Sequence, residues 1–323
     1  MGAARKAYKY VKRNAGYYAF LALRAGVGSL PAGARLSVGE ALGSIAYSLA
    51  GRERRRAMDS LSKAFGNEKP REELEQIARA SFRNLGRCAA ELCGLWRGKA
   101  DQILPLFDDT EARPKIESHL ASGRGVINVT AHLGNWELVG AWAAANGYPI
   151  TVIARRIYFE KYNRMVVSMR ERFGMQVIYQ DESPRKLLRA LRDGRILAIL
   201  ADQDVRRLDG VFVPFLGRPA FTPTGPVALA LAAKVPMVFG HAVRVGRDRH
   251  KIVVSDTIEF DRSDKKKAVV EGTRAWSAMV EAAIREYPEQ WVWMHRRWRT
   301  KLSDRPEAAR RSGYEVQAAE AYP

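Results

Sequence analysis

Short apolar runs that alternate with helical stretches constrain the fold more than any other feature of this sequence. From residue 124 onward such runs lie at 126–129, 150–153, 177–179, 196–200, 235–239 and 252–254. Parallel strands need a long crossover between them, and that crossover is usually a helix. The pattern therefore predicts an α/β fold with a largely parallel central sheet flanked by helices. Ligands in such sheets bind beyond the carboxyl ends of the strands, where we expect the functional residues.

The N-terminal residues 1–56 segregate their charge from their apolar side chains. Eleven basic side chains stand there against two acidic ones, Glu40 and Glu53. The apolar runs 17–23 and 41–49 both fall short of the roughly 18 uninterrupted apolar residues that a spanning helix needs. We predict two amphipathic helices in a membrane interface, with Lys and Arg near lipid phosphates. A helical hairpin packed on the rest of the chain, or a single N-terminal anchor, is the alternative.

The remaining chain divides into residues 57–302, which we predict to form the α/β domain, and a loose polar tail at 303–323. Helical spacing dominates residues 53–99. Pro70 marks a predicted helix start because Glu72 and Glu73 follow it, and carboxylates in a first turn suit the helix dipole. No A-x-A cleavage site follows the first apolar stretch, so secretion is not expected.

A formal net charge of +19 predicts an anionic partner. Nucleic acid, anionic lipid and an acidic protein all satisfy that requirement. Zinc-finger spacing, a basic zipper and an RNA-recognition signature are all missing from the sequence, so we expect no nucleic-acid partner. The two cysteines, Cys88 and Cys93, are expected to be free thiols, and no metal site is predicted.

Residues 128–137, Asn-Val-Thr-Ala-His-Leu-Gly-Asn-Trp-Glu, carry the strongest chemical signal. A strand is predicted to end near Thr130 and a helix to begin near Asn135, which places His132 on the turn between them. Five positions along one helix would separate His132 from Glu137 by about 140°. With His132 ahead of the helix, Glu137 is predicted to accept a hydrogen bond from one imidazole nitrogen, leaving the other as a base. A structural histidine is the alternative, and Asn135 is predicted to cap the helix.

At these residues the sequence resembles the lipid A biosynthesis acyltransferases, within the larger group that shares an H-x4-D/E motif. His132 and Glu137 match that motif. Further similar blocks follow in the family's order, at 202–204, 211–217, 222–225 and 293–300, and the resemblance covers residues 5–302. One such block is weak support, whereas several in the right order are specific.

The resemblance implies transfer of an acyl chain from acyl carrier protein or CoA to a hydroxyl of a lipid A precursor, at the cytoplasmic face of the bacterial inner membrane. His132 would remove the hydroxyl proton, and Glu137 would hold the imidazole. Arg170 matches a site arginine of the family that would stabilise the oxyanion, and Asp202 an acidic position that would orient this arginine. No metal or cofactor is expected, because a thioester is already activated.

Other residues are predicted to bind substrate. Arg155 and Arg156 follow a strand and suit acceptor phosphates. Arg296 and Arg297 lie among Trp291, Trp293 and Trp298, an arrangement typical of lipid headgroup contact. Asn135 and Gln203 complete the predicted set, and a solvated basic surface is the alternative for the arginine clusters. Phosphatidylinositol mannoside, an aminolipid and a lysophospholipid are the alternative acceptors, and a catalytically silent membrane-surface protein is the rival class.

Overall fold

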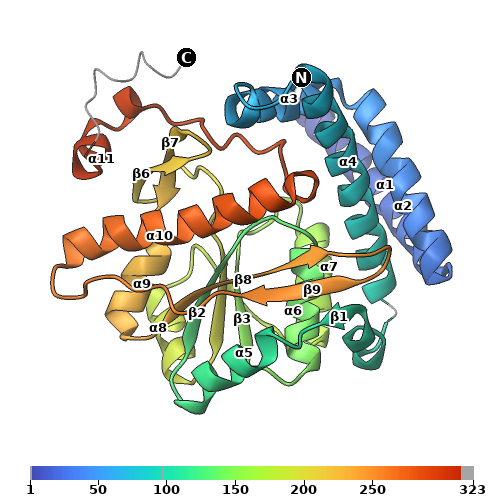
Figure 1. Cartoon of the computed structure of the whole chain (residues 1–323). Coiled ribbons are helices and arrows are strands. Elements are labelled where there is room, and N and C mark those ends of the chain that lie inside the picture. The colour runs from blue at the N-terminus through green and yellow to red at the C-terminus, as the bar shows by residue number, and fades with distance from the viewer. Residues whose placement is uncertain (1, 97, 314–323) are drawn as a thin grey trace.

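The computed structural model describes residues 2–96 and 98–313, and its centre is a seven-stranded, mostly parallel sheet (Figure 1). In spatial order the strands are β1 (Phe107–Asp108), β9 (His250–Val254), β8 (Met237–Arg244), β2 (Val126–Thr130), β5 (Ile196–Leu200), β3 (Ile150–Ala154) and β4 (Gln176–Tyr179). Within this sheet, β8 and β9 pair antiparallel and the other neighbouring strands pair parallel. The predicted α/β fold with a mostly parallel sheet is therefore confirmed.

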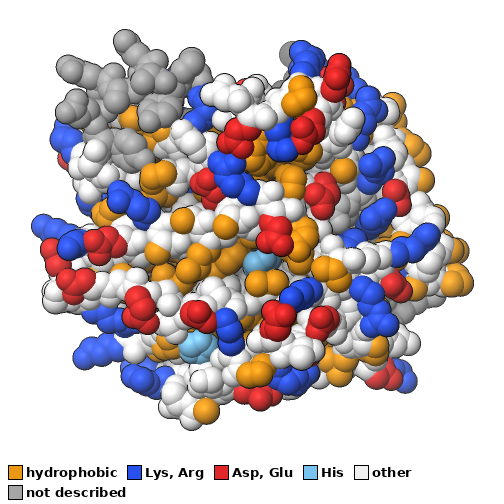
Figure 2. All heavy atoms as spheres, in the orientation of Figure 1, with side chains coloured by type: hydrophobic (Ala, Val, Ile, Leu, Met, Phe, Trp, Pro, Cys, Tyr) orange, Lys and Arg blue, Asp and Glu red, His pale blue; other side chains and the backbone are white. Residues whose placement is uncertain are grey.

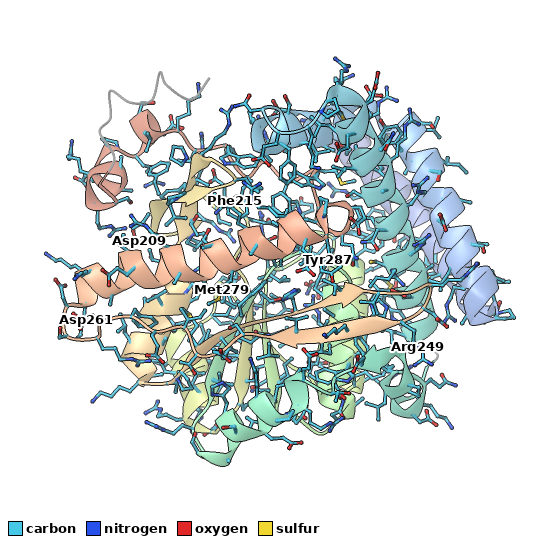
Figure 3. The ribbon with its side chains drawn as sticks, in the orientation of Figure 1. Asp209, Phe215, Arg249, Asp261, Met279 and Tyr287 are labelled. Carbon is cyan, nitrogen blue, oxygen red and sulfur yellow. The ribbon has the colours of Figure 1, made fainter. Side chains whose placement is uncertain are left out.

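Alternate side chains of the strands feed two apolar cores, one on each face of the sheet. Ile127 and Val129 of β2 pack with α8 (Pro184–Arg192), α9 (Gly225–Ala233) and α10 (Lys265–Glu286). Val126 points to the other face, which α5 (Ala112–Ala121), α6 (Trp136–Ala145) and α7 (Glu160–Arg172) cover. This period of two is why the strand sequences read as continuous apolar runs. Figure 3 shows α10 extending between the labelled Asp261 and Tyr287.

A hairpin of β6 (Gly210–Phe215) and β7 (Arg218–Pro223) lies outside the main sheet, and the strand pattern did not predict it. Its turn residues Leu216 and Gly217 have φ angles of 49° and 76°. A left-handed conformation is costly for leucine. Tertiary contacts hold it here, because Leu216 is buried and its amide donates to Glu281 at 2.6 Å. The hairpin could not be predicted from the sequence, because leucine rarely adopts the left-handed conformation that this turn requires.

The N-terminal region forms the predicted helices, α1 (Gly2–Ser29) and α2 (Ala32–Leu49), followed by α3 (Gly51–Phe65) and α4 (Arg71–Leu95) after Pro70. Helix α2 lies directly against α4 because glycines let the backbones meet. A Cβ at Gly43 would stand 2.3 Å from the Phe82 carbonyl oxygen, and one at Gly86 would stand 2.0 Å from that of Gly39. Within the described residues, no helix combines the length and apolar character needed to cross a membrane.

The first part of the segment predicted to be loose is folded, so that prediction is wrong for residues 303–313. A short 3-10 helix (Leu302–Asp304) and α11 (Pro306–Arg311) bury Leu302 and Ala309 against Phe212 and Phe221 of the β6–β7 hairpin. The remaining residues of the predicted tail, 314–323, lie outside the described part of the chain.

The glycine contacts between α2 and α4 make a stability prediction. Gly43→Ala should lower the free energy of unfolding by about 1–3 kcal/mol, because the added methyl group overlaps the α4 backbone. Gly33→Ala, in the same helix with nothing within 4 Å of the new Cβ, should be neutral or stabilising by up to about 1 kcal/mol. Urea unfolding followed by circular dichroism measures both, and equal midpoints for the two variants would contradict this packing.

Candidate active site

His132 lies on the turn between β2 and α6, and local backbone geometry fixes that turn. Gly134 has a φ of +59°, and a Cβ there would stand 2.1 Å from the Ala242 carbonyl oxygen, so only glycine fits. The Asn135 side chain accepts a hydrogen bond from the Leu138 amide at 3.2 Å and caps α6, as predicted. The backbone of Leu133 also forms a β-bridge with Trp291, which ties the turn to the segment after α10.

Asp202, and not Glu137, holds the imidazole of His132. Asp202 Oδ1 lies 2.7 Å from His132 Nδ1, and Oδ2 accepts from the His132 backbone amide at 2.9 Å. The Trp291 indole donates to the same Oδ2 at 2.9 Å. Because β2 and β5 are parallel neighbours, residues that follow them emerge at the same edge of the sheet. The predicted hydrogen bond between Glu137 and His132 is therefore wrong.

Glu137 pairs instead with Arg170 of α7. Arg170 Nε donates to Glu137 Oε2 at 3.0 Å, and Arg170 Nη2 donates to Oε1. The expectation that Asp202 orients Arg170 is thus also wrong. Asp202 pairs with His132 and Glu137 pairs with Arg170, which is the reverse of the predicted pairing. Spacing along the chain placed Glu137 near His132 but could not reveal the guanidinium that α7 brings to it. Both members of this bidentate pair are about 15% exposed or less, so the geometry is held in a nearly dry environment.

The buried ion pair sets the protonation states of Asp202 and His132. Burial disfavours a charged Asp202, but the His132 charge and hydrogen bond outweigh it and hold the pKa of Asp202 well below its usual range. Burial likewise opposes protonation of His132, yet the Asp202 carboxylate raises the pKa of His132 above its ordinary value. An ionised Asp202 can only accept, so Nδ1 of a neutral His132 carries the proton and Nε2 keeps the lone pair.

Gln203 and His295 pack against the imidazole ring of His132, and the Gln203 amide nitrogen is nearly equidistant from the two ring nitrogens of His132. Gln203 Nε2 lies 3.2 Å from His132 Nε2 and 3.2 Å from His295 Nε2. The rings of His132 and His295 stand 4.8 Å apart and nearly perpendicular. Burial, together with the charge of His132, lowers the pKa of His295 to about 4. From the sequence, His295 was expected to be structural, and the one signal for another role is its place inside the terminal basic-aromatic block at 293–300.

The described residues offer one possible grouping of metal ligands, formed by His132, Asp202 and His295, whose donor atoms lie within 4.8 Å of one another. His132 Nδ1 and Asp202 Oδ1 already bond to each other. The two Nε2 atoms remain, which is fewer than the three or four protein ligands of a zinc site. A hydrogen-bonded base is the better description of this geometry.

A polar cavity opens in front of His132 at the carboxyl end of the sheet. His132, Gln203, Arg170, Arg155 and Arg207 are among its lining residues. Of the two arginines predicted to meet phosphates, only Arg155 lines this cavity. Arg156 donates to Asp181 at 3.1 Å and lies over the Tyr179 ring.

Behind Trp136 and Glu137, apolar space continues between α6 and the sheet. A first cavity is lined by apolar side chains that include Val152, Ala198 and Leu200, and a second adjoins it and shares Val139 and Ile150. The polar cavity and the first apolar cavity share Glu137 and Arg170. The site thus lies where a polar opening meets an apolar interior.

Three residues of the predicted headgroup-binding set are buried instead. Arg297 is 0% exposed and donates to the Phe221 carbonyl at 2.8 Å and to Thr222 Oγ1 at 2.6 Å. Trp291 and Trp293 are also 0% exposed. The prediction that these three side chains reach lipid headgroups is therefore wrong, while Arg296 is exposed. Asn135, predicted to bind substrate, is buried as well and acts through its cap.

A buried charge cluster beneath the turn explains what holds Asn135. Asn135 Nδ2 donates to Glu91 Oε2 at 2.8 Å, and Glu91 also pairs with Arg244 at 2.7 Å and with His250 at 3.1 Å. Burial opposes ionisation of Glu91, but His250 and Arg244 lower its pKa to about 2. This cluster could not be predicted from the sequence, because Glu91 and Arg244 are 153 residues apart.

Comparison with known proteins now decides the family. The family described as "Bacterial lipid A biosynthesis acyltransferase" matches residues 4–300. The chain belongs to this family. It is accordingly an acyltransferase, with an acyl donor and a lipid acceptor.

Individual relatives act on different lipids by name. The phosphatidylinositol mannoside acyltransferase of Mycolicibacterium smegmatis is 28% identical over 241 residues, covering 73% of this chain and 76% of that protein. The enzyme of the same name from Mycobacterium tuberculosis is 27% identical over 201 residues, with 61% and 62% covered. The lipid A biosynthesis palmitoleoyltransferase of Escherichia coli is 24% identical over 235 residues, with 71% and 74% covered.

The pairing of His132 with Asp202 makes a pH prediction for acyl transfer. A base must be neutral, so the acid limb of kcat/KM should lie above the ordinary imidazole pKa of about 6.5, because Asp202 raises the pKa of His132. Asp202→Asn should move this limb to lower pH and reduce kcat by about 100-fold or more. Rate–pH profiles of both proteins test this, and a limb that stays in place would exclude Asp202 as the orienting group.

Proposed function

We propose that this acyltransferase moves a fatty acyl chain from acyl carrier protein or CoA to a hydroxyl of a lipid A precursor, with His132 as the general base. The observation that carries the proposal is the ionised, buried Asp202 on one imidazole nitrogen while the other faces the polar cavity. Base and orienting carboxylate resemble two members of a serine-hydrolase triad, with the acceptor hydroxyl in place of the serine.

His132 Nε2 removes the acceptor proton as the hydroxyl oxygen bonds to the thioester carbonyl carbon. The carbon–sulfur bond then breaks, and the same proton passes from the imidazolium to the leaving sulfur. Asp202 stabilises the imidazolium between these steps. Two nitrogens of Arg170 donate to Glu137, and its Nη1 serves as the donor for the oxyanion. Glu137 is therefore a positioning residue for Arg170 and not the partner of the base.

The apolar cavities behind Trp136 hold the acyl chain while its carbonyl group lies beside His132. Burial in this space contributes about 0.8 kcal/mol for each methylene removed from water, which favours a long chain over a short one.

A substitution inside the first apolar cavity tests this assignment. Ala198→Phe should fill the space beside Val152 and shift the preferred donor to shorter acyl chains, with little loss of kcat on the shortest. Competition between thioesters of different chain length, read by mass spectrometry of the products, measures the shift. An unchanged preference would place the chain elsewhere.

A phosphatidylinositol mannoside is the second candidate acceptor, favoured by the higher identity to the enzyme named for that lipid. Both acceptors are phosphate-bearing glycolipids. Arg155 and Arg207 line the polar cavity and are the candidate phosphate contacts. A lipid extract of cells with and without the protein, compared by mass spectrometry, distinguishes the two acceptors.

Helices α1 and α2 bring the polar cavity to the plane of the membrane. One stripe of α2 is apolar and exposed to solvent. It consists of Leu42, Ile45 and Leu49, whose exposed fractions are 41%, 53% and 80%, respectively. Figure 2 shows apolar and basic side chains intermixed along the edge where Figure 1 places these helices. Helix α1 in turn packs on α7, with Tyr17 against Tyr162 and Lys161 donating to Asn14 at 2.6 Å. This arrangement suits an amphipathic surface at the cytoplasmic face of the inner membrane.

Replacing the α2 stripe tests membrane binding without altering charge. The double variant Ile45→Ser and Leu49→Ser should reduce partitioning to phosphatidylglycerol-containing vesicles by about tenfold, from the lost apolar burial. Leu208→Ser, an exposed apolar position outside α1 and α2, is the control and should bind as the unaltered protein does. Equal sedimentation of all three proteins with vesicles would argue against this surface.

The catalytic assignment itself is tested by His132→Ala. Purified protein should transfer acyl groups from a carrier-protein or CoA thioester to a lipid A precursor, and the variant should lose at least about 100-fold in turnover. Glu137→Gln should lose less, because it acts through Arg170. Full activity of His132→Ala would overturn the mechanism, and product formed only on phosphatidylinositol mannoside would replace the first acceptor with the second.

A further inference from the structure

The two apolar cavities behind Trp136 meet at a polar side chain. Asn128, in the middle of β2, lines both of them, together with Val139 and Ile150. Its amide lies over the neighbouring strand β8, since a Cβ at Gly240 would stand 2.7 Å from Oδ1 and 3.3 Å from Nδ2. Glycine at that position therefore leaves the space that the amide occupies.

The Asn128 amide has no partner in the protein. Within residues 2–96 and 98–313, no group forms a hydrogen bond with either end of it, and Oδ1 is buried. Buried polar side chains are nearly always hydrogen-bonded, because an unpaired one loses its bonds to water without replacing them. The amide is therefore free to bond to a polar atom of a ligand.

Apolar space continues on both sides of this amide. On the side of the catalytic turn, the first cavity is lined by side chains that include Val152 and Leu200. On the other side, the second cavity extends between the sheet and helices α5 and α6, which Figure 1 shows below and beside β2. Its apolar walls include Ile116, Val126, Trp142, Val238 and Ile252. A chain that reaches Asn128 therefore has apolar space ahead of it, so the amide does not mark the end of the cavity.

The other polar residues of the second cavity lie away from the junction. His241 also lines both cavities, but its imidazole stacks on Phe239, which packs in the core on the opposite face of the sheet. His119 and Tyr148 line the second cavity and not the first. Among the described residues, Asn128 is thus the one with a hydrogen-bonding side chain where the two cavities meet.

Asn128 is within reach of the middle of a long acyl chain whose carbonyl group lies beside His132. Four residues of chain lead from one to the other, so their Cα atoms are at most about 14 Å apart. Thr130 lies between them on the same face of β2 and lines the first cavity. A chain that enters from the polar cavity therefore passes Thr130 before Asn128, and its methyl end lies in the second cavity.

We propose that Asn128 binds an oxygen substituent in the middle of the donor's acyl chain, and that the enzyme therefore selects long hydroxylated chains over unsubstituted ones. This inference rests on the proposed function, in which the two cavities hold the acyl chain.

The selection follows from what each chain does to the amide. A run of methylenes across the junction covers the amide and leaves it unpaired. A hydroxyl can accept from the amide nitrogen, or donate to the amide oxygen once the amide turns about its Cβ–Cγ bond. A site with its own polar group rejects a substrate that lacks the matching one, whereas an apolar pocket only weakly rejects an added hydroxyl. The amide therefore supplies a discrimination that the apolar walls cannot.

The competing explanation is that Asn128 limits chain length. In that case an unsubstituted chain stops short of the amide, the second cavity stays without a ligand, and a hydroxyl on the chain brings no gain. The two roles differ in what an apolar replacement of Asn128 does. It lengthens the preferred chain if the amide limits length, and it removes the preference for a hydroxyl if the amide binds one.

The experiment offers the full-length protein pairs of thioesters of one chain length, one unsubstituted and one with a single hydroxyl placed at successive carbons. Mass spectrometry of the acylated lipid gives the ratio of the two products. A second measurement needs no acceptor, because the corresponding free fatty acids compete with a fluorescent fatty acid for binding.

Two variants remove the contact in different ways, and a third is the control. Asn128→Leu keeps the branched shape of the side chain without its hydrogen-bonding atoms. Gly240→Ala keeps the amide but places a methyl group where it lies. Val139→Ala is the matched control, because Val139 also lines both cavities and offers only apolar contact.

The unaltered protein should prefer a mid-chain hydroxyl by about tenfold over the unsubstituted chain, the scale of pairing one buried amide. A hydroxyl near either end of the chain should bring no such preference. Asn128→Leu should abolish or reverse the preference, and Gly240→Ala should reduce it. Val139→Ala should weaken both chains alike and leave their ratio unchanged.

The outcomes separate this inference from the proposed function. Acyl transfer with no preference for a hydroxyl, or with a preference that Asn128→Leu leaves in place, contradicts the inference alone. A longer preferred chain in Asn128→Leu, without any effect of a hydroxyl, overturns it in favour of the length limit. Selective binding of hydroxylated fatty acids without acyl transfer to any lipid contradicts the proposed function but supports the role of Asn128. A protein that neither binds fatty acids nor transfers them contradicts both.

Discussion

The ionised carboxylate of Asp202, buried at 1% exposure, is the interaction on which the site depends. It joins three segments that are far apart in the chain: the turn after β2, the end of β5 and the segment after α10 that carries Trp291. A buried charge left without partners is strongly destabilising, so these donors are needed for folding as well as for chemistry. The same charge fixes the His132 tautomer and raises its pKa. The contacts of Asp202 that join these three segments therefore also set the tautomer and the pKa of His132.

A second buried charge holds the same turn from below. Glu91 of α4, paired with Arg244 and His250, anchors Asn135, and Asn135 starts α6. Helix α4 also packs tightly on α2, which is one of the helices proposed to meet the membrane. Helix α4 therefore contacts both the proposed membrane surface and the turn that carries His132. The chain thus supports His132 from two sides, with Asp202 fixing the ring and Glu91 fixing the backbone that carries it.

Two pairs of oppositely charged residues lie at the site, Asp202 with His132 and Glu137 with Arg170. This pairing, which is the reverse of the predicted one, has a chemical consequence. Glu137 was predicted to orient His132, and its side chain is 14% exposed against 0% for Asp202. Paired with Arg170, it instead aligns a cation beside the cavity, while the better-buried Asp202 serves the base. The proposed oxyanion donor and the proposed base are then held by separate carboxylates, and the charge of Glu137 also contributes to the raised pKa of His132.

The sequence by itself determined the sheet, the position of His132 and the membership of the acyltransferase family. Apolar periodicity and the order of short sequence blocks are local properties, so they can be identified from the order of the residues alone. Only the tertiary structure decided which carboxylate serves which partner, that Arg297 and two tryptophans are buried, and that His295 and Gln203 stand at the base. Those facts depend on which side chains meet across the edge of a parallel sheet. Spacing along the chain measures the distance between neighbours on one element, but it carries no information on contacts that separate elements create when they pack.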